Sequence, residues 1–387
     1  MTRAVAQVDL AALSANLGVL RARAGSADLM AVVKADAYGH GMVAVAREAR
    51  AAGVDWLGVA LPSEALALRD AGDVGRILAW LWTPGESDVE RCVARDIDLS
   101  VSSAWAVEEV AEAARRTGQA ARVHLKVDTG LTRNGVALGD LAGVLDLLRA
   151  VVGDGLVTVE AVWSHLADGD TPGAASVREQ RECFERAWEQ VLASGLRPGM
   201  RHLANSGALL AHPDCAYDLV RTGIAMYGLT PAAVLGASRD LGLTPVMTLM
   251  ADLAHAKDVA VGTSVSYGWR WSASTPTRLG LLPIGYADGL PRAAGAPRSG
   301  PPVEVLVDGR LRPIIGTVAM DQCVVDLGGG SRVSAGEPVV LFGAGDRGEW
   351  TADDWASALG TIGYEIVTRI GPRVPREYIG ASGEVRA

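Results

Sequence analysis

Lysine is rare in this chain, and the positions of the few lysines make them the first candidates for chemistry. Among 36 lysine and arginine residues, only Lys34, Lys126 and Lys257 are lysines. Lys34 follows the apolar run Ala-Val-Val, which predicts a buried strand ending at the lysine. Desolvation at such a place lowers the pKa of an amine and favours its neutral, nucleophilic form. The amine therefore suits Schiff-base chemistry, although a lysine that merely reaches solvent from a strand end fits the same pattern.

A second group of residues has the composition of a phosphate site. Ser206, in the segment HLANSG, offers a hydroxyl group. Gly223, followed by Ile224 in RTGIAMYG, lets main-chain N–H groups approach a ligand closely. Ordinary strand-to-helix turns contain the same residue types. A nucleophilic lysine combined with a phosphate cradle nevertheless suggests pyridoxal 5'-phosphate as the cofactor.

Arg221 lies two residues before this glycine, and its chemistry bears on how such a cofactor would react. A guanidinium with a pKa above ~12 donates hydrogen bonds but does not give up its proton. A pyridine nitrogen that faces Arg221 would stay largely unprotonated, so the ring would be a weaker electron sink with fewer side reactions. His165, at the end of an earlier apolar run, is placed to hydrogen-bond Arg221 or to stack on the ring. A surface or ion-paired position is the alternative for both residues.

Tyr267 is the candidate acid/base of the second half of the chain. It lies in the glycine-containing polar loop SVSYGWRW. Because the unperturbed pKa of tyrosine is near ~10, a cationic neighbour such as Arg133 would be needed to lower it. A packed tyrosine in a turn is the simpler interpretation of this residue alone. The polar turns PIGYADG and GTVAMDQ are not specific when taken alone.

The first 230 residues alternate short apolar runs with amphipathic helical segments. This alternation predicts right-handed βαβ units and a parallel sheet. Eight such units fit a (β/α)8 barrel, in which functional side chains gather at the C-terminal ends of the strands. An open, doubly wound sheet is the alternative, but no GxGxxG segment follows the first strand. The expected strands are 29–33, 56–60, 77–82, 98–102, 122–127, 157–164, 202–205 and 219–226.

The sequence pattern changes near residue 240. Short runs rich in β-branched residues are separated there by Gly, Pro and Asp, and Asp308-Gly309 is a hairpin signal. One late helix is expected over 351–358, with Thr351 as its cap. The fold class is therefore predicted as α/β, with residues 1–240 forming a (β/α)8 barrel and residues 241–387 a mostly-β domain.

Composition excludes several classes of protein. The net charge is −9 and no basic stripe is present, which argues against a nucleic-acid partner. No apolar run approaches the ~18 residues of a membrane helix, and Asp9 interrupts the place of a signal peptide's apolar stretch. No metal site is expected. Scattered cysteines without a CxxC motif predict reduced thiols in a cytoplasmic protein; they are Cys92, Cys183, Cys215 and Cys323.

Eight segments, taken in order and across nearly the full length, resemble the alanine racemase family of fold-type III pyridoxal-phosphate enzymes. The resemblance implies the predicted fold, a (β/α)8 barrel followed by a β domain. It also implies racemisation of L-alanine and D-alanine, which supplies D-alanine for peptidoglycan. The segments are AVVKADAYGHG, KVDTGLTRNG, HLANSGA, RTGIAMYG, VSYG, PIGYADG, GTVAMDQ and IGYEIVTRIGPRVPREY.

The resemblance assigns a role to each matching residue that contacts the cofactor. Lys34 is similar to the lysine that carries pyridoxal 5'-phosphate and acts as the base on the face of the D-enantiomer. Tyr267 is similar to the opposing base, which acts on the L-enantiomer and comes from the other subunit of a homodimer. Arg221, held by His165, is similar to the partner of the pyridine nitrogen. The remaining residues matched to the cofactor are Tyr38, Asn205, Ser206, Gly223, Ile224 and Tyr364.

Substrate contacts follow from the same resemblance. Arg133 is similar to the arginine that meets the substrate carboxylate, and Met320 to a main-chain contact supplied by the partner subunit. Tyr286 is similar to a residue at the substrate entry. Lys126 matches a position that is often carbamylated in the family, where it orients Arg133.

Three alternatives share parts of this pattern. Racemases of larger amino acids often carry a secretion signal, which we do not expect here. Decarboxylases of the same two-domain architecture typically place a cysteine where the VSYG loop offers Tyr267. A non-catalytic pyridoxal-phosphate-binding protein would be a single barrel, without a second domain.

Overall fold

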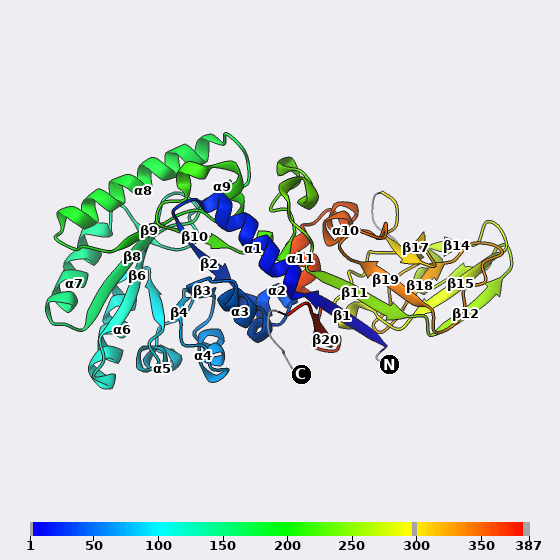
Figure 1. Cartoon of the computed structure of the whole chain (residues 1–387), viewed down its shortest axis with the longest axis horizontal. Coiled ribbons are helices and arrows are strands. Elements are labelled where there is room, and N and C mark those ends of the chain that lie inside the picture. Colours follow the sequence, from blue (N-terminus) through cyan, green and yellow to red (C-terminus); the bar gives the residue numbers. More distant parts are fainter. Residues whose placement is uncertain (1–2, 296–299, 382–387) are drawn as a thin grey trace.

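The computed structural model describes residues 3–295 and 300–381, which form an α/β barrel joined to a mostly-β part (Figure 1). The barrel contains eight parallel strands in the order β10-β2-β3-β4-β5-β6-β8-β9, and an isolated bridge between Asn205 and Arg221 links its two edges. The predicted (β/α)8 barrel is therefore confirmed as a nearly closed barrel. Its strands are β2 (Asp28–Val32), β3 (Trp56–Val59), β4 (Arg76–Ala79), β5 (Asp98–Val101), β6 (Ala121–Asp128), β8 (Val157–Trp163), β9 (Met200–His202) and β10 (Leu219–Thr222).

Amphipathic helices pack around the barrel strands. The first of them shows the physical reason: Leu10, Leu13 and Leu17 recur at helical spacing and are fully or almost fully buried. The Asp9 side chain caps this helix by accepting a hydrogen bond from the Ala12 N–H at 3.0 Å. The helices of this part are α1 (Leu10–Ala24), α3 (Met42–Ala51), α4 (Pro62–Asp70), α5 (Asp88–Ala94), α6 (Ala104–Thr117), α7 (Leu141–Gly153), α8 (Ala175–Ala193) and α9 (Ser206–Ala211).

The second part is built on a twisted, mainly antiparallel sheet in the order β12-β15-β18-β17-β16-β19-β11-β1-β20. Asp308 and Gly309 form the predicted hairpin turn with φ values of 49° and 67°. Thr351 caps the predicted late helix, α10 (Ala352–Leu359). The strands of this sheet that follow the barrel are β11 (Met247–Asp252), β12 (His255–Val259), β15 (Thr277–Leu282), β16 (Glu304–Val307), β17 (Arg310–Ile315), β18 (Cys323–Asp326), β19 (Pro338–Phe342) and β20 (Arg376–Ile379).

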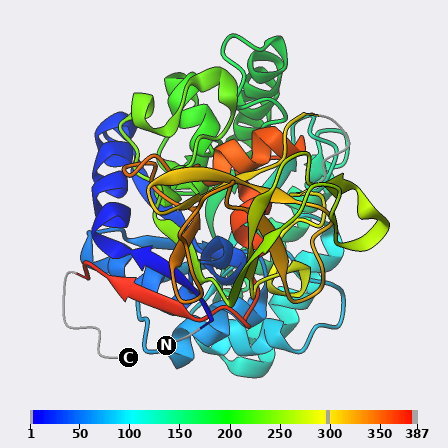
Figure 2. The same ribbon diagram turned by 90° about the vertical axis from the view of Figure 1, so that its right-hand side faces the viewer.

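The first strand of the chain, β1 (Ala4–Asp9), lies in this second sheet rather than in the barrel. It pairs antiparallel with β11 and parallel with β20, and Figure 2 shows the blue β1 beside the red β20. The predicted division at residue 240 therefore does not describe β1, which enters the β sheet before the chain reaches the barrel. Alternating burial of Ala4, Ala6 and Val8 explains its strand conformation.

The two parts share one continuous hydrophobic core that extends from the barrel helices to Phe342 and Trp355. A short helix of the β part, α11 (Gly363–Thr368), packs against the segment that follows β2. The β part thereby covers one side of the C-terminal end of the barrel. Within the described ranges, no helix has the length and apolar character needed to cross a membrane.

Candidate active site

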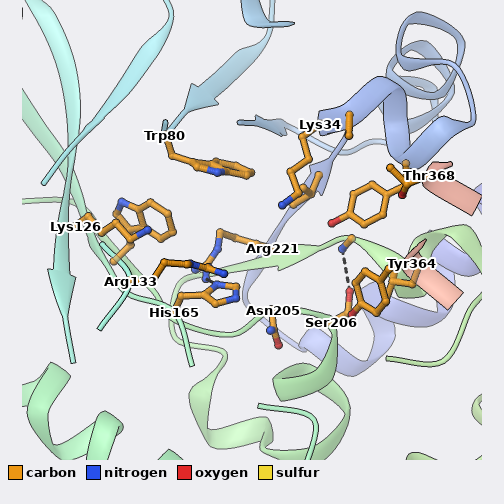
Figure 3. A pocket seen from close by; sticks show the side chains of 16 residues that line it. Lys34, Trp80, Lys126, Arg133, His165, Asn205, Ser206, Arg221, Tyr364 and Thr368 are labelled. Atoms are coloured by element: carbon orange, nitrogen blue, oxygen red, sulfur yellow. Dashed lines mark hydrogen bonds between the residues drawn. The ribbon is translucent and has the colours of Figure 1, made fainter. Parts of the chain in front are cut away.

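A cavity of 440 Å³ opens at the C-terminal ends of the barrel strands, where α11 covers them (Figure 3). Most of the residues predicted from the sequence line this cavity. Its wall also includes Trp80, Trp163 and Thr368, which sequence reasoning did not find. The predicted residues that it brings together are Lys34, Tyr38, Lys126, Arg133, His165, Asn205, Ser206, Arg221, Gly223, Ile224 and Tyr364.

Lys34 lies two residues after the end of β2 and is partly buried, with its Nζ atom 5.8 Å from the centroid of the Trp80 ring. Burial lowers the pKa of Lys34, and the positive charge of Arg133 lowers it further. The carboxylate of Glu64 acts in the opposite direction. The environment therefore favours the neutral amine that a nucleophile or base requires.

The segment after Lys34, α2 (Lys34–Gly39), forms a left-handed turn. Four successive residues, from Ala35 to Tyr38, have φ between 52° and 54°. Each such residue costs roughly 1–2 kcal/mol, so the turn needs external support. Glu64 accepts a hydrogen bond from the Ala35 N–H at 2.6 Å, and the His40 Nδ1 atom lies 3.0 Å from the carbonyl oxygens of Ala37 and Tyr38. The turn thereby fixes Lys34 at one end and Tyr38 at the other.

Hydroxyl groups converge on one side of the cavity. The Ser206 Oγ atom accepts a hydrogen bond from the Gly223 N–H at 2.9 Å. A Cβ atom on Gly223 would lie only 2.5 Å from the Tyr38 hydroxyl, so the absence of a side chain creates this close approach. Burial raises the pKa of Tyr38 and of Tyr364, and both phenols therefore stay protonated and able to donate. These donors suit a phosphate group.

Arg221 occupies the opposite side of the cavity and is almost fully buried. Its Nη2 group donates to the carbonyl oxygens of Ser164 at 2.9 Å and Leu203 at 3.1 Å, and lies 3.2 Å from His165 Nδ1. Burial lowers the pKa of Arg221 to about 9, which leaves it charged at neutral pH. Burial, followed by the charge of Arg221, lowers the pKa of His165, so its neutral ring accepts from the arginine. In the described part of the chain, Nε–H is the donor of Arg221 that has no partner.

Lys126 and Arg133 lie on the side of the cavity formed by β6 and the loop that follows it. The Lys126 Nζ atom lies 4.3 Å from the centroid of the Trp163 ring. Burial, with the charges of Arg221 and Arg133, lowers the pKa of Lys126 to about 8. Trp80 and Trp163, with ring centroids 6.1 Å apart, form an apolar wall beside these cations. Both tryptophans lie at the C-terminal ends of barrel strands, β4 and β8. This position was the signal in the sequence that could have identified them as residues of the site.

Three predicted residues lie on the β part and do not line this cavity. The side chains of Tyr267, Met320 and Tyr286 are exposed by 69%, 53% and 38%. Their segments are joined by hydrogen bonds: the Thr317 hydroxyl donates to the Tyr267 carbonyl, and the Ala287 N–H donates to the Met320 carbonyl. A single chain therefore carries two candidate surfaces, one centred on Lys34 and one centred on Tyr267.

The fold and the site together define a class of two-domain barrel enzyme. Its barrel is nearly closed and carries a desolvated lysine and an anion cradle at the C-terminal end, and it is joined to a β domain. The family model described as alanine racemase, N-terminal domain, matches residues 8–231. The model described as alanine racemase, C-terminal domain, matches residues 246–378. The chain belongs to the alanine racemase family and is an enzyme, an isomerase acting on amino acids.

Individual relatives agree with the family models over nearly the whole length. The chain is 54% identical over 382 residues to alanine racemase from Streptomyces coelicolor, covering 97% of this chain and 96% of the relative. The structure of alanine racemase from D-cycloserine-producing Streptomyces lavendulae has a TM-score of 0.95 at 50% identity, with 98% of each chain covered. The Bacillus anthracis enzyme with bound L-Ala-P has a TM-score of 0.87 at 32% identity, covering 98% of this chain and 95% of that one.

Proposed function

We propose that this enzyme interconverts L-alanine and D-alanine with pyridoxal 5'-phosphate, using Lys34 and the partner subunit's Tyr267 as two opposed bases in a homodimer. The observation that carries the proposal is the cavity that combines the amine of Lys34, whose pKa is lowered by burial, with the buried guanidinium of Arg221 and the cradle at Gly223. The exposed position of Tyr267, away from the cavity of its own chain, supports a site completed by a second copy.

The residues of the cavity fit the cofactor. When bound, pyridoxal 5'-phosphate supplies an electron sink that acidifies the α-proton of an attached amino acid. Lys34 would hold it covalently, and the free Nε–H of Arg221 would donate to its ring nitrogen. Donation from a group that keeps its proton leaves that nitrogen largely unprotonated. The residues that would contact the phosphate are Tyr38, Ser206, Gly223, Ile224 and Tyr364, with His165 and Asn205 beside the ring.

Inversion at Cα requires two groups that act on opposite faces. In the D-to-L direction the Lys34 amine removes the α-proton from one face, and the hydroxyl of the partner's Tyr267 delivers a proton to the opposite face. In the L-to-D direction the phenolate of the partner's Tyr267 removes the α-proton, and the Lys34 ammonium delivers a proton to the other face. A single base would return the proton to the face from which it came, which gives exchange without inversion.

Substrate binding would align the Cα–H bond with these bases. Arg133, whose side chain reaches the cavity, would pair with the substrate carboxylate, and the main-chain N–H of the partner's Met320 would donate to it. Tyr286, close to Met320 on the β part, would border the entry. We place the enzyme in the cytoplasm, where the product would supply D-alanine for peptidoglycan.

Lys126 is expected to bind carbon dioxide as a carbamate. Only the neutral amine reacts, and a pKa of about 8 means that its neutral fraction rises as pH increases from about 7 to about 9. The charges of Arg221 and Arg133, which lower this pKa, also stabilise the anionic carbamate. NMR with 13C-bicarbonate should show a carbamate signal that grows with pH and is missing in Lys126→Met. A Lys257→Met variant should keep it; a signal equally strong in Lys126→Met would contradict the assignment.

Gly223→Ala is expected to weaken cofactor binding. The new Cβ atom would meet the Tyr38 hydroxyl, and Tyr38 has little room to move because its ring packs 4.9 Å from that of Tyr227. Overpacking of this kind costs about 1–3 kcal/mol, so the Kd for pyridoxal 5'-phosphate should rise about fivefold or more. Fluorescence titration measures the change. Gly143→Ala, in α7 with open space around it, is the matched control and should leave the Kd unchanged. An unchanged Kd in Gly223→Ala would remove this glycine from the phosphate site.

The proposed activity is tested by the optical rotation of L-alanine mixed with purified protein and pyridoxal 5'-phosphate. Decay of the rotation to zero supports racemisation of alanine. A rotation that persists while the cofactor is bound would contradict the substrate assignment. A panel of larger amino acids, monitored for loss of rotation and for CO2 release, would then separate a broader racemase from a decarboxylase.

A further inference from the structure

A line of buried polar groups runs through the barrel interior from Arg221 to the opposite end of the barrel. The Arg221 Nη1 atom lies 3.2 Å from His202 Nδ1. His202 Nε2 lies 2.9 Å from His124 Nδ1, and His124 Nε2 lies 3.1 Å from Asp98 Oδ2. The side chains of Asp98, His124 and His202 are fully buried. Asp98 is the first residue of β5, whereas Arg221 lies near the C-terminal end of β10, so the line crosses the length of the barrel.

The hydrogens of this line have a single consistent arrangement. Arg221 can only donate, so His202 Nδ1 must accept, and neutral His202 carries its proton on Nε2. His202 then donates to His124 Nδ1, and His124 donates through Nε2 to a carboxylate at Asp98. If Asp98 donated instead, both histidines would reverse, and a protonated Nδ1 of His202 would face a donor of Arg221.

Two arginines hold Asp98, at the far end of the line, as a carboxylate anion. Arg76 donates to Asp98 Oδ2 at 2.5 Å, and Arg122 donates to Asp98 Oδ1 at 2.7 Å. Burial alone raises the pKa of Asp98, but the bond to His124 and these two cations bring it below its ordinary value. Arg221 itself touches no carboxylate in the described residues. In the described residues, the hydrogen-bonded path from Asp98 to Arg221 therefore runs through the two histidine rings.

We propose that Asp98 is a positioning residue that acts on Arg221 through His124 and His202. Its carboxylate selects the tautomer in which His202 offers a lone pair to Arg221, and it serves as the remote counter-charge of that desolvated guanidinium. This relay holds the Nη1 group in place, so that Nε–H would be free to donate to the ring nitrogen of the proposed cofactor. The effect of this relay on catalysis rests on the proposed function. The predicted tautomers of the two histidines are independent of that function.

The direct test is NMR of the 15N-histidine-labelled holoenzyme at neutral pH. His124 and His202, assigned by single His→Gln variants, should both be neutral with the proton on Nε2. Either ring found protonated on Nδ1, or doubly protonated, overturns the relay. Because this measurement requires neither racemisation nor a variant at Asp98, its outcome is independent of the proposed function.

Variants then separate positioning from structural support. In Asp98→Asn the tautomers should mix or reverse, and kcat for both alanine enantiomers should fall about tenfold with KM nearly constant. Arg76→Gln, which removes a partner of Asp98 but leaves the relay intact, should keep the tautomers and lower kcat by less than about twofold. If Asp98→Asn does not fold, His124→Gln interrupts the same line. Unchanged His202 tautomer and kcat in the folded variant would refute the proposal.

Discussion

Tyr267→Phe is expected to slow α-proton removal from L-alanine by about a hundredfold or more, while proton exchange on D-alanine continues. Loss of a general base typically costs 10²- to 10⁴-fold, and the variant retains Lys34, which acts on the other face. D-alanine should therefore exchange its α-proton with solvent deuterium and be recovered as D-alanine. Net racemisation should be lost in both directions.

The measurement is proton NMR of each enantiomer in deuterated buffer with the holoenzyme. Trp269→Phe is the matched control, because Trp269 lies in the same loop, is 76% exposed and has no assigned contact with substrate. It should exchange both enantiomers at rates close to those of the parent enzyme. Equal loss of exchange from L-alanine and D-alanine in Tyr267→Phe would contradict the assignment of two opposed bases.

Lys34→Ala should have a larger effect, because one amine holds the cofactor and also serves as a base. We expect racemisation in both directions to fall by about 10⁴-fold or more. Mass spectrometry after borohydride reduction should show the covalently bound cofactor in the parent protein but not in the variant. Lys257→Ala is the control, because this exposed lysine of β12 does not line the cavity that holds Lys34. A cofactor adduct that persists in Lys34→Ala would refute the role of Lys34.

The fold could be predicted because its signals are local. Eight apolar runs bounded by helices correspond to the eight barrel strands. The polar residues that follow these runs are therefore predicted to lie together at the C-terminal end of the barrel. Lys34 and His165 are examples. Each lies two residues beyond the end of its strand, and both line the cavity. The strand β1 escaped notice because its partners, β11 and β20, lie more than two hundred residues away in the sequence.

Other features of the site depend on long-range geometry that residue types do not reveal. The left-handed turn from Ala35 to Tyr38 contains no glycine, so nothing in its composition signals positive φ. Its support comes from Glu64, on a different helix. The contact between His124 and His202 joins strands that are not adjacent, and two apparently unrelated core histidines therefore form one polar line.

The two candidate surfaces lie on different parts of one chain. Lys34 lies in the barrel cavity, whereas Tyr267 lies on the exposed surface of the β part of the same chain. A two-base mechanism then requires that each site combine the lysine of one subunit with the tyrosine of the other. In a symmetric dimer the same pairing would complete two equivalent sites.

Mixing Lys34→Ala with Tyr267→Phe tests this claim most directly. Each variant alone should be inactive as a racemase. After the subunits are dissociated together and reassociated, random pairing should restore roughly a quarter of the parent activity, because half of the dimers contain one site with both native residues. If both bases belonged to the same chain, every site would lack one of them. Inactivity of the reassociated mixture, with heterodimers verified by mass spectrometry, would contradict the shared site.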